Sequence, residues 1–135
     1  MRPLLLDTCA ALWMTAGGLS GRAEGEIRMA REHGIDVLVS PISAWEIGLL
    51  VSKGRVALVL PPLPWFEALL EEGVTLAPMP PDVLFAASQL PGPPLRDAAD
   101  RIIAATARAY GYRLMTRDRP LLDFAASGQV EAIAC

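Results

Sequence analysis

Histidine, cysteine and lysine are all scarce in this chain of 135 residues. His33 is the only histidine, which excludes mechanisms that need a histidine pair and argues against a Ser-His-Asp triad. Its place directly before Gly34, at a predicted helix end, favours a surface role. The two cysteines, Cys9 and Cys135, cannot by themselves supply the four ligands of a zinc site.

Long apolar runs are also missing, since no stretch approaches the roughly 18 residues that a membrane span needs. The apolar residues at the start of the chain are too few for a secretory signal and end at Asp7. Hydrophobic residues make up 53% and charged residues 20% of the sequence, which is typical of an ordered globular chain. We therefore expect a cytoplasmic protein with no membrane partner and no disulfide, whose residues 1–135 form one domain.

Short apolar segments alternate with helical patterns along the chain. Proline, glycine and capping residues mark most of the boundaries, as at Ser20, Ser40-Pro41 and Gly111. Strands are predicted at 3–6, 36–39, 74–77, 112–115 and 130–134, and helices at 20–34, 41–54, 65–73, 81–90, 97–110 and 121–126. This alternation predicts the α/β class, with a parallel sheet of about four to five strands flanked by helices on both faces.

Five acidic residues fall where these elements would bring them to one edge of the sheet. Asp7 ends the first strand, Asp118 follows the fourth, and Glu46 lies in the helix after the second. Asp97 and Asp100 begin a further helix, and their spacing predicts a shared helix face. Ligand sites in open parallel sheets form at the carboxyl ends of the strands, so we expect these acids to meet there.

A cluster of carboxylates needs protonation or a cation. Two carboxylates about 4 Å apart repel by roughly 4 kcal/mol at an effective dielectric of about 20, and Lys53 is not placed to neutralise them. Oxygen ligands without histidine or thiolate suit Mg²⁺ or Mn²⁺, which commonly bridge to a phosphate. The sequence therefore indicates hydrolysis of a phosphodiester.

Each acid taken singly also has an ordinary structural interpretation. Asp7 and Asp97 could cap helices, Glu46 could be an exposed helix residue, and Asp118 could begin a turn. A phosphate-transferring aspartate enzyme also places an acid like Asp7 after its first strand. Such enzymes usually need a second acid two residues later, where this chain has Cys9, or a lysine after a late strand.

Four stretches together resemble the acidic motifs of PIN domains, in the VapC-like toxin branch, in order and over nearly the whole chain. They are Leu4-Leu5-Leu6-Asp7-Thr8, Ser40-Pro41-Ile42-Ser43-Ala44-Trp45-Glu46-Ile47, Arg96-Asp97-Ala98-Ala99-Asp100-Arg101-Ile102-Ile103-Ala104-Ala105-Thr106-Ala107 and Leu114-Met115-Thr116-Arg117-Asp118. The resemblance implies a three-layer α/β/α fold and a Mg²⁺- or Mn²⁺-dependent endoribonuclease. It also implies a homodimer inhibited by a cognate antitoxin.

Carried onto matching positions, the resemblance implies that Asp7, Glu46, Asp100 and Asp118 are the catalytic metal ligands, with Thr116 in support. Asp97 is a fifth candidate ligand, although relatives often have Pro-Phe between the two aspartates where this chain has Ala98-Ala99. The alternative is a PIN-like module that binds RNA or protein without cutting it.

Basic residues concentrate near the acids despite a net charge of −3. Arg96, Arg117 and Arg119 are candidates to hold flanking RNA phosphates, because they adjoin the acidic motifs and arginine binds phosphate well. The resemblance, rather than the composition, favours RNA, a second copy and an antitoxin as partners. Several large apolar residues fit either a partner surface or the core: Trp13, Trp45, Trp65, Leu49, Leu50, Val59 and Leu60.

Overall fold

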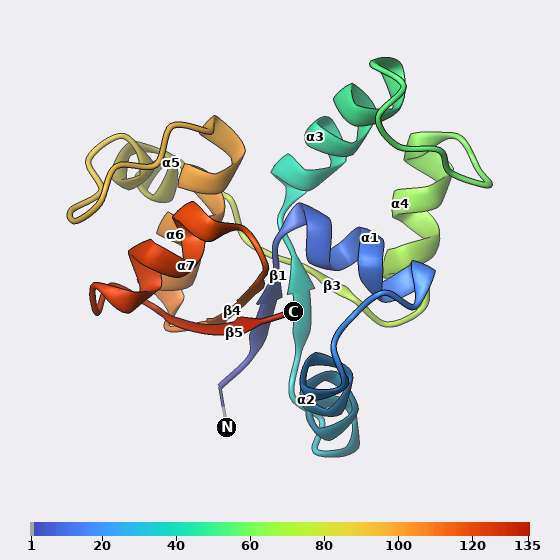
Figure 1. Ribbon diagram of the computed structural model, residues 1–135, viewed down its shortest axis with the longest axis horizontal. Helices are drawn as coiled ribbons and strands as arrows, with labels where there is room; N and C mark the ends of the chain where they lie inside the picture. The colour runs from blue at the N-terminus through green and yellow to red at the C-terminus, as the bar shows by residue number, and fades with distance from the viewer. Residues whose placement is uncertain (1) are drawn as a thin grey trace.

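A five-stranded parallel sheet forms the centre of the computed structural model, which describes residues 2–135. The strand order is β3-β2-β1-β4-β5 (Figure 1). The strands are β1 (Leu4–Leu6), β2 (Val37–Val39), β3 (Thr75–Leu76), β4 (Arg113–Thr116) and β5 (Glu131–Ala134). The helices are α1 (Thr8–Ala16), α2 (Gly21–Glu32), α3 (Pro41–Ser52), α4 (Pro62–Glu71), α5 (Pro81–Ala87), α6 (Ala98–Tyr110) and α7 (Arg119–Ala126).

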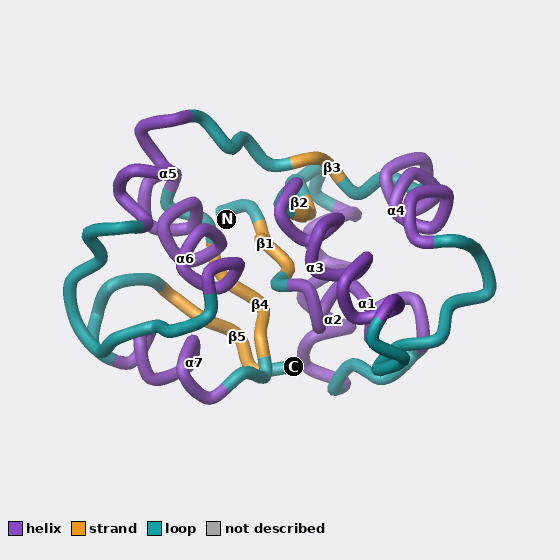
Figure 2. Tube along the Cα trace, turned by 90° about the horizontal axis from the view of Figure 1, so that it is seen from above, coloured by secondary structure: helices purple, strands orange, loops and turns teal. Residues whose placement is uncertain are grey.

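Helices cover both faces of the sheet, which confirms the predicted fold class. Successive side chains of a strand point to opposite faces, so Leu4 and Leu6 pack in one core cluster and Leu5 in the other. The first cluster includes side chains from α1 to α4, and the second includes side chains from α6 and α7. These two groups of helices lie on opposite sides of the sheet (Figure 2). The central strands β1, β2 and β4 are buried from both sides, as their nearly unbroken apolar sequences predict, whereas the edge strands β3 and β5 are largely exposed.

The predicted strands and helices are all present, with ends displaced by a few residues. The predicted helix at 20–34 was expected to be exposed, but α2 buries Ala23, Ile27 and Ala30 along one face. Asp97 does not share a helix face with Asp100, because it precedes α6 and caps it instead. Helix α1 is an addition to the predicted helices; it begins directly after Asp7, and Asp7 caps it.

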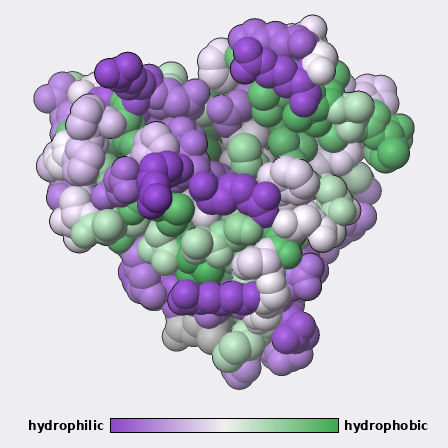
Figure 3. Space-filling model, viewed as in Figure 1, coloured by the Kyte–Doolittle hydropathy of each residue, from purple (hydrophilic) through white to green (hydrophobic). Residues whose placement is uncertain are grey.

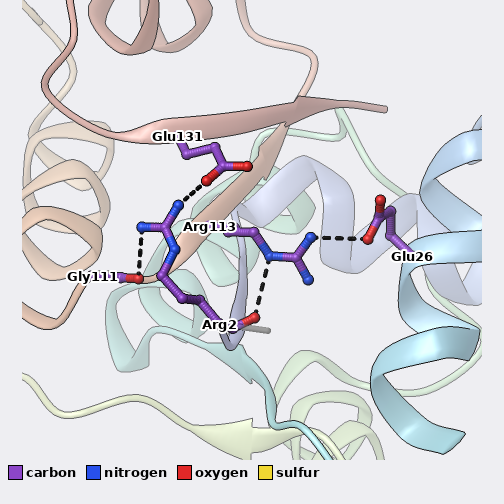
Figure 4. Close-up of polar contacts among 5 residues, drawn as sticks. All are labelled: Arg2, Glu26, Gly111, Arg113 and Glu131. Atoms are coloured by element: carbon purple, nitrogen blue, oxygen red, sulfur yellow. Dashed lines mark hydrogen bonds and ion pairs between the residues drawn. The ribbon is translucent and has the colours of Figure 1, made fainter. Parts of the chain in front are cut away.

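Arginine side chains secure the amino ends of the strands (Figure 4). Arg2 forms an ion pair with Glu131 on β5 and donates a hydrogen bond to the carbonyl of Gly111. Arg113, at the start of β4, donates to Glu26 of α2 at 2.9 Å and to the carbonyl of Arg2 at 3.2 Å. These contacts join the first residues of the chain, α2 and the two last strands at the edge opposite the acidic residues.

The large apolar residues divide between core and surface. Trp65 is 8% exposed and belongs to the core, whereas Trp13, Trp45 and Val59 are 41%, 54% and 97% exposed. Trp13 and Val59 line a groove of about 580 Å³ between α1 and the segment that joins α3 to α4. Figure 3 shows apolar side chains gathered over α3 and α4. Among residues 2–135, every helix is too short or too polar to span a bilayer.

Candidate metal centre

The order of the strands places the candidate site at the centre of the sheet edge. The chain proceeds from β1 to β2 and β3 on one side, whereas β4 and β5 lie on the other. The helices that follow β1 and β4 therefore diverge at the carboxyl ends of these strands, which is where open parallel sheets bind ligands. Asp7 follows β1 directly, and Asp118 lies two residues after β4.

Two hydrogen bonds hold the buried carboxylate of Asp7. The residue is 3% exposed, and its Oδ1 accepts from the backbone N–H of Ala10 at 2.7 Å. Its Oδ2 accepts from the hydroxyl of Thr116 at 2.5 Å. The first bond is the cap of α1, so the residue that begins the helix also presents a carboxylate at the sheet edge.

Thr116 connects Asp7 with Asp118. It is the last residue of β4 and is fully buried. Its hydroxyl donates to Asp7 and accepts from the backbone N–H of Asp118 at 3.0 Å. Asp118 in turn caps α7 by accepting from the backbone N–H of Leu121 at 3.3 Å. One hydroxyl thus orients the carboxylate after β1 and the start of the segment after β4.

Three further carboxylates come from α3 and the start of α6. Carboxylate oxygens of Glu46, Asp97 and Asp100 lie within 4.8 Å of one another. The carboxylate of Asp97 accepts from the backbone N–H of Asp100 at 2.9 Å, and this cap holds the two aspartates together. Asp100 also lies within electrostatic range of Asp118, Glu46 and Asp7. Glu46, Asp97 and Asp100 therefore form one group, and Asp7 and Asp118 lie near enough for their charges to act on it.

The carboxylates raise one another's pKa values in addition to the effect of burial. Burial is the main cause that raises the pKa of Asp7 to about 6, and the charges of Asp118 and Glu46 add to it. The pKa of Asp100 is raised to about 8 by burial first and then by Asp97, Asp118, Glu46 and Asp7. Burial and the charges of Asp97 and Asp118 also raise the pKa of Glu46. Crowded carboxylates of this kind favour binding of a cation.

The donor set fits a hard divalent ion. Every candidate ligand is a carboxylate, and the salt bridges found within residues 2–135 join other residues. His33 is exposed at the end of α2, where its ring contacts the carbonyl of Met29. Oxygen ligands without imidazole suit Mg²⁺ or Mn²⁺ better than zinc.

The candidate arginines differ in their surroundings. Arg96 and Arg119 are exposed beside the segments that carry the acids. Arg117 is also exposed, but its guanidinium donates to the carbonyls of Gly18 and Cys135 and covers the ring of Trp13. Arg117 is therefore engaged with the protein itself.

Sequence reasoning missed three residues that support the site. Arg101 donates to the carbonyls of Ala87 and Leu95, at 2.9 and 2.8 Å, and so anchors the loop that precedes α6. The buried hydroxyls of Thr8 and Ser43 lie 2.9 Å apart and join α1 to α3. Thr8 directly follows Asp7, and Ser43 precedes Glu46 by nearly one helical turn, so their proximity to the acids was the available signal.

Comparisons with known proteins agree with this arrangement. A family model described as PIN domain matches residues 4–126. The chain is 36% identical over 121 residues to Ribonuclease VapC22 of Mycobacterium tuberculosis, covering 90% of this chain and 91% of that protein.

Solved structures share the fold at lower identity. A chain of the DNA-bound VapBC2 complex of Rickettsia felis superposes with a TM-score of 0.70 at 13% identity, and 99% of each chain is covered. A chain of FitAcB from Neisseria gonorrhoeae gives a TM-score of 0.56 at 21% identity, and 96% of each chain is covered.

Proposed function

Because the chain belongs to the PIN domain family, we propose that it is a metal-dependent endoribonuclease and the toxin member of a toxin–antitoxin pair. The observation that carries the proposal is the group of three carboxylates formed by Glu46, Asp97 and Asp100, with Asp7 and Asp118 at the ends of β1 and β4 close enough to raise the pKa of Asp100. The name of the relative from Mycobacterium tuberculosis, a ribonuclease, supports RNA as the substrate.

The acids would hold Mg²⁺ or Mn²⁺, with Asp7, Glu46, Asp100 and Asp118 as ligands and Asp97 beside them. When bound, such an ion lowers the pKa of a water molecule and neutralises charge on the phosphate. Carboxylates are the bases at hand to accept the proton of the attacking water, since the only histidine lies at the end of α2.

Thr116 has a defined part in this scheme. It keeps one oxygen of Asp7 fixed by a 2.5 Å hydrogen bond, so the carboxylate is already oriented before an ion binds. Arg96 and Arg119 are exposed and would bind phosphates on either side of the cleaved bond. An RNA substrate would place the protein in the cytoplasm.

A cleavage assay with a matched substitution tests the nuclease. Purified protein is incubated with total RNA in the presence of Mn²⁺, Mg²⁺ or EDTA, and the cut ends are mapped. We expect cleavage with metal, none with EDTA, and none for Asp7→Asn. Asp123→Asn, which changes an exposed acid on α7, is the control and should cut as the wild type does. Equal cleavage by Asp7→Asn and wild type would refute the proposal.

The rival function is an RNA- or protein-binding module that does not cut. It predicts RNA binding that Asp7→Asn leaves unchanged and the absence of new RNA ends with every metal. The group of Glu46, Asp97 and Asp100, with Asp7 and Asp118 near it, favours the nuclease, because a binding module has no need for carboxylates whose mutual repulsion opposes folding.

A homodimer and an antitoxin are the proposed protein partners. The solved structures of similar fold named above are VapBC2, bound to DNA, and FitAcB, and this chain exposes Trp13 and Val59 beside an apolar groove. Light scattering of the purified chain, alone and co-expressed with the product of a neighbouring small reading frame, tests both. A monomer that forms no complex with that product would contradict the proposal.

A further inference from the structure

Arg117 lies between two residues of the proposed site, Thr116 and Asp118, yet its side chain is bound by distant parts of the protein. Its Nη2 donates to the carbonyl of Gly18 at 2.8 Å and to the carbonyl of Cys135 at 2.7 Å. One nitrogen therefore links the segment after β4 to the turn after α1 and to the residue that follows β5.

The guanidinium also packs on an aromatic ring of α1. Its central carbon lies 4.7 Å from the ring centroid of Trp13. Gly18 approaches the same ring so closely that a Cβ at this position would lie 2.2 Å from Cε3 of Trp13. Glycine is thus required there, and Trp13 is in contact with both the backbone of Gly18 and the side chain of Arg117.

The segment held by Arg117 is the one that orients the carboxylates. The backbone N–H of Cys135 donates to the carbonyl of Thr116 at 2.9 Å, while Arg117 donates to the carbonyl of Cys135, so the two segments bind each other in both directions. Thr116 then donates to Asp7. Contacts run without interruption from α1 through Arg117 to the residues at the ends of β4 and β1.

We propose that Arg117 is a positioning residue, which holds the segment carrying Thr116 and Asp118 in place relative to Asp7, rather than a ligand of substrate phosphate. The inference rests on the proposed nuclease function. Two N–H groups of the guanidinium already donate to backbone carbonyls, and the indole ring of Trp13 packs against its face. Loss of these contacts of Arg117 would displace the carboxylates, and a misplacement of about 1 Å costs on the order of a hundred-fold in rate.

Steady-state kinetics on RNA separate positioning from phosphate binding. For Arg117→Ala we expect kcat to fall by about ten- to a hundred-fold, with KM and the salt dependence of RNA binding unchanged. Arg119→Ala should instead raise KM and reduce the slope of log K against log salt by about one. Arg117→Lys, which keeps the charge and a donor nitrogen, should restore part of the rate. Arg22→Ala, at an exposed position on α2, is the neutral control.

Two structural readouts accompany the kinetics. The near-ultraviolet circular dichroism of Arg117→Ala should differ from that of the wild type, because Trp13 loses its stacked cation, and its Mn²⁺ affinity should fall. A raised KM and a reduced salt slope at unchanged kcat would show that Arg117 binds phosphate and would overturn the proposal. Wild-type behaviour in every assay would overturn it as well.

The role of Arg117 can still be tested if the wild type cuts no RNA or if a variant does not fold. If the wild type cuts no RNA, the proposed function fails, and Arg117 is judged by Mn²⁺ affinity and the tryptophan signal. A loss in both supports positioning, and no change in either overturns it. If Arg117→Ala does not fold, Arg117→Lys is judged by the same criteria.

Discussion

Replacing Asp7 by asparagine should stabilise the metal-free protein at alkaline pH, although it removes a proposed metal ligand. The pKa of Asp7 is 3.8 in an unperturbed chain and about 6 in the folded protein, mainly because the side chain is buried. A group whose pKa is raised by folding favours the folded state while it is protonated. That contribution is complete below pH 3.8 and is lost as the pH rises through about 6.

The magnitude follows from the two pKa values. One pKa unit corresponds to about 1.4 kcal/mol, so ionised Asp7 costs about 3 kcal/mol at pH 8, most of which develops between pH 4 and pH 8. Asparagine stays neutral over this range, and its amide can still accept from Ala10 and bond with the hydroxyl of Thr116. The free energy of unfolding of Asp7→Asn should therefore rise relative to the wild type by about 2 kcal/mol from pH 4 to pH 8.

Urea unfolding in EDTA, followed by circular dichroism at pH 4 and pH 8, measures this difference directly. Asp123→Asn serves as the control, because it removes an exposed acid from α7 and should show almost no change with pH relative to the wild type. With saturating Mn²⁺ at pH 8 the order should reverse, since the wild type gains binding energy that the asparagine variant loses. A difference between Asp7→Asn and wild type that is the same at both pH values would refute the electrostatic reasoning.

Three further predictions concern the site and the core. Thr116→Val leaves Oδ2 of buried Asp7 without its hydrogen-bond donor and should cost about 2 kcal/mol of unfolding free energy and most of the RNA cleavage. Thr106→Val, at another fully buried threonine, should spare cleavage. Mn²⁺ at about a hundred times its dissociation constant should stabilise the wild type by about 2.7 kcal/mol in thermal unfolding, and Glu46→Gln should lose most of this gain. Phe124→Ala, in the core between α7 and the sheet, should cost about 3–5 kcal/mol in urea unfolding.

Each of these three predictions has a result that would contradict it. Equal loss of cleavage in Thr116→Val and Thr106→Val would show that general destabilisation, not the bond to Asp7, is responsible. Full Mn²⁺ stabilisation of Glu46→Gln would remove Glu46 from the ligand set. A cost below about 1 kcal/mol for Phe124→Ala would mean that the site can collapse around the smaller side chain.

Local sequence patterns predicted most of the fold. The alternation of apolar strands with capped helices gave the α/β class and the positions of the elements, because strand burial and helix capping depend on neighbours within a few residues. Asp7 illustrates the limit of these rules, since its cap interpretation is confirmed while the same carboxylate is a proposed metal ligand. Asp118, for which the start of a turn was the ordinary interpretation, caps α7. A single residue at a strand end can satisfy the first turn of a helix and face a crevice at the same time.

What the sequence determined by itself is the set of acidic residues, their order along the chain and the elements that carry them. Only the tertiary structure decided which side chains meet: the strand order sets β1 beside β4, and thereby brings the hydroxyl of Thr116 to Asp7 and the guanidinium of Arg117 to Trp13. The reason is physical. Capping and periodicity act over three or four residues, whereas a contact across a hundred residues depends on how the sheet orders its strands and buries both faces.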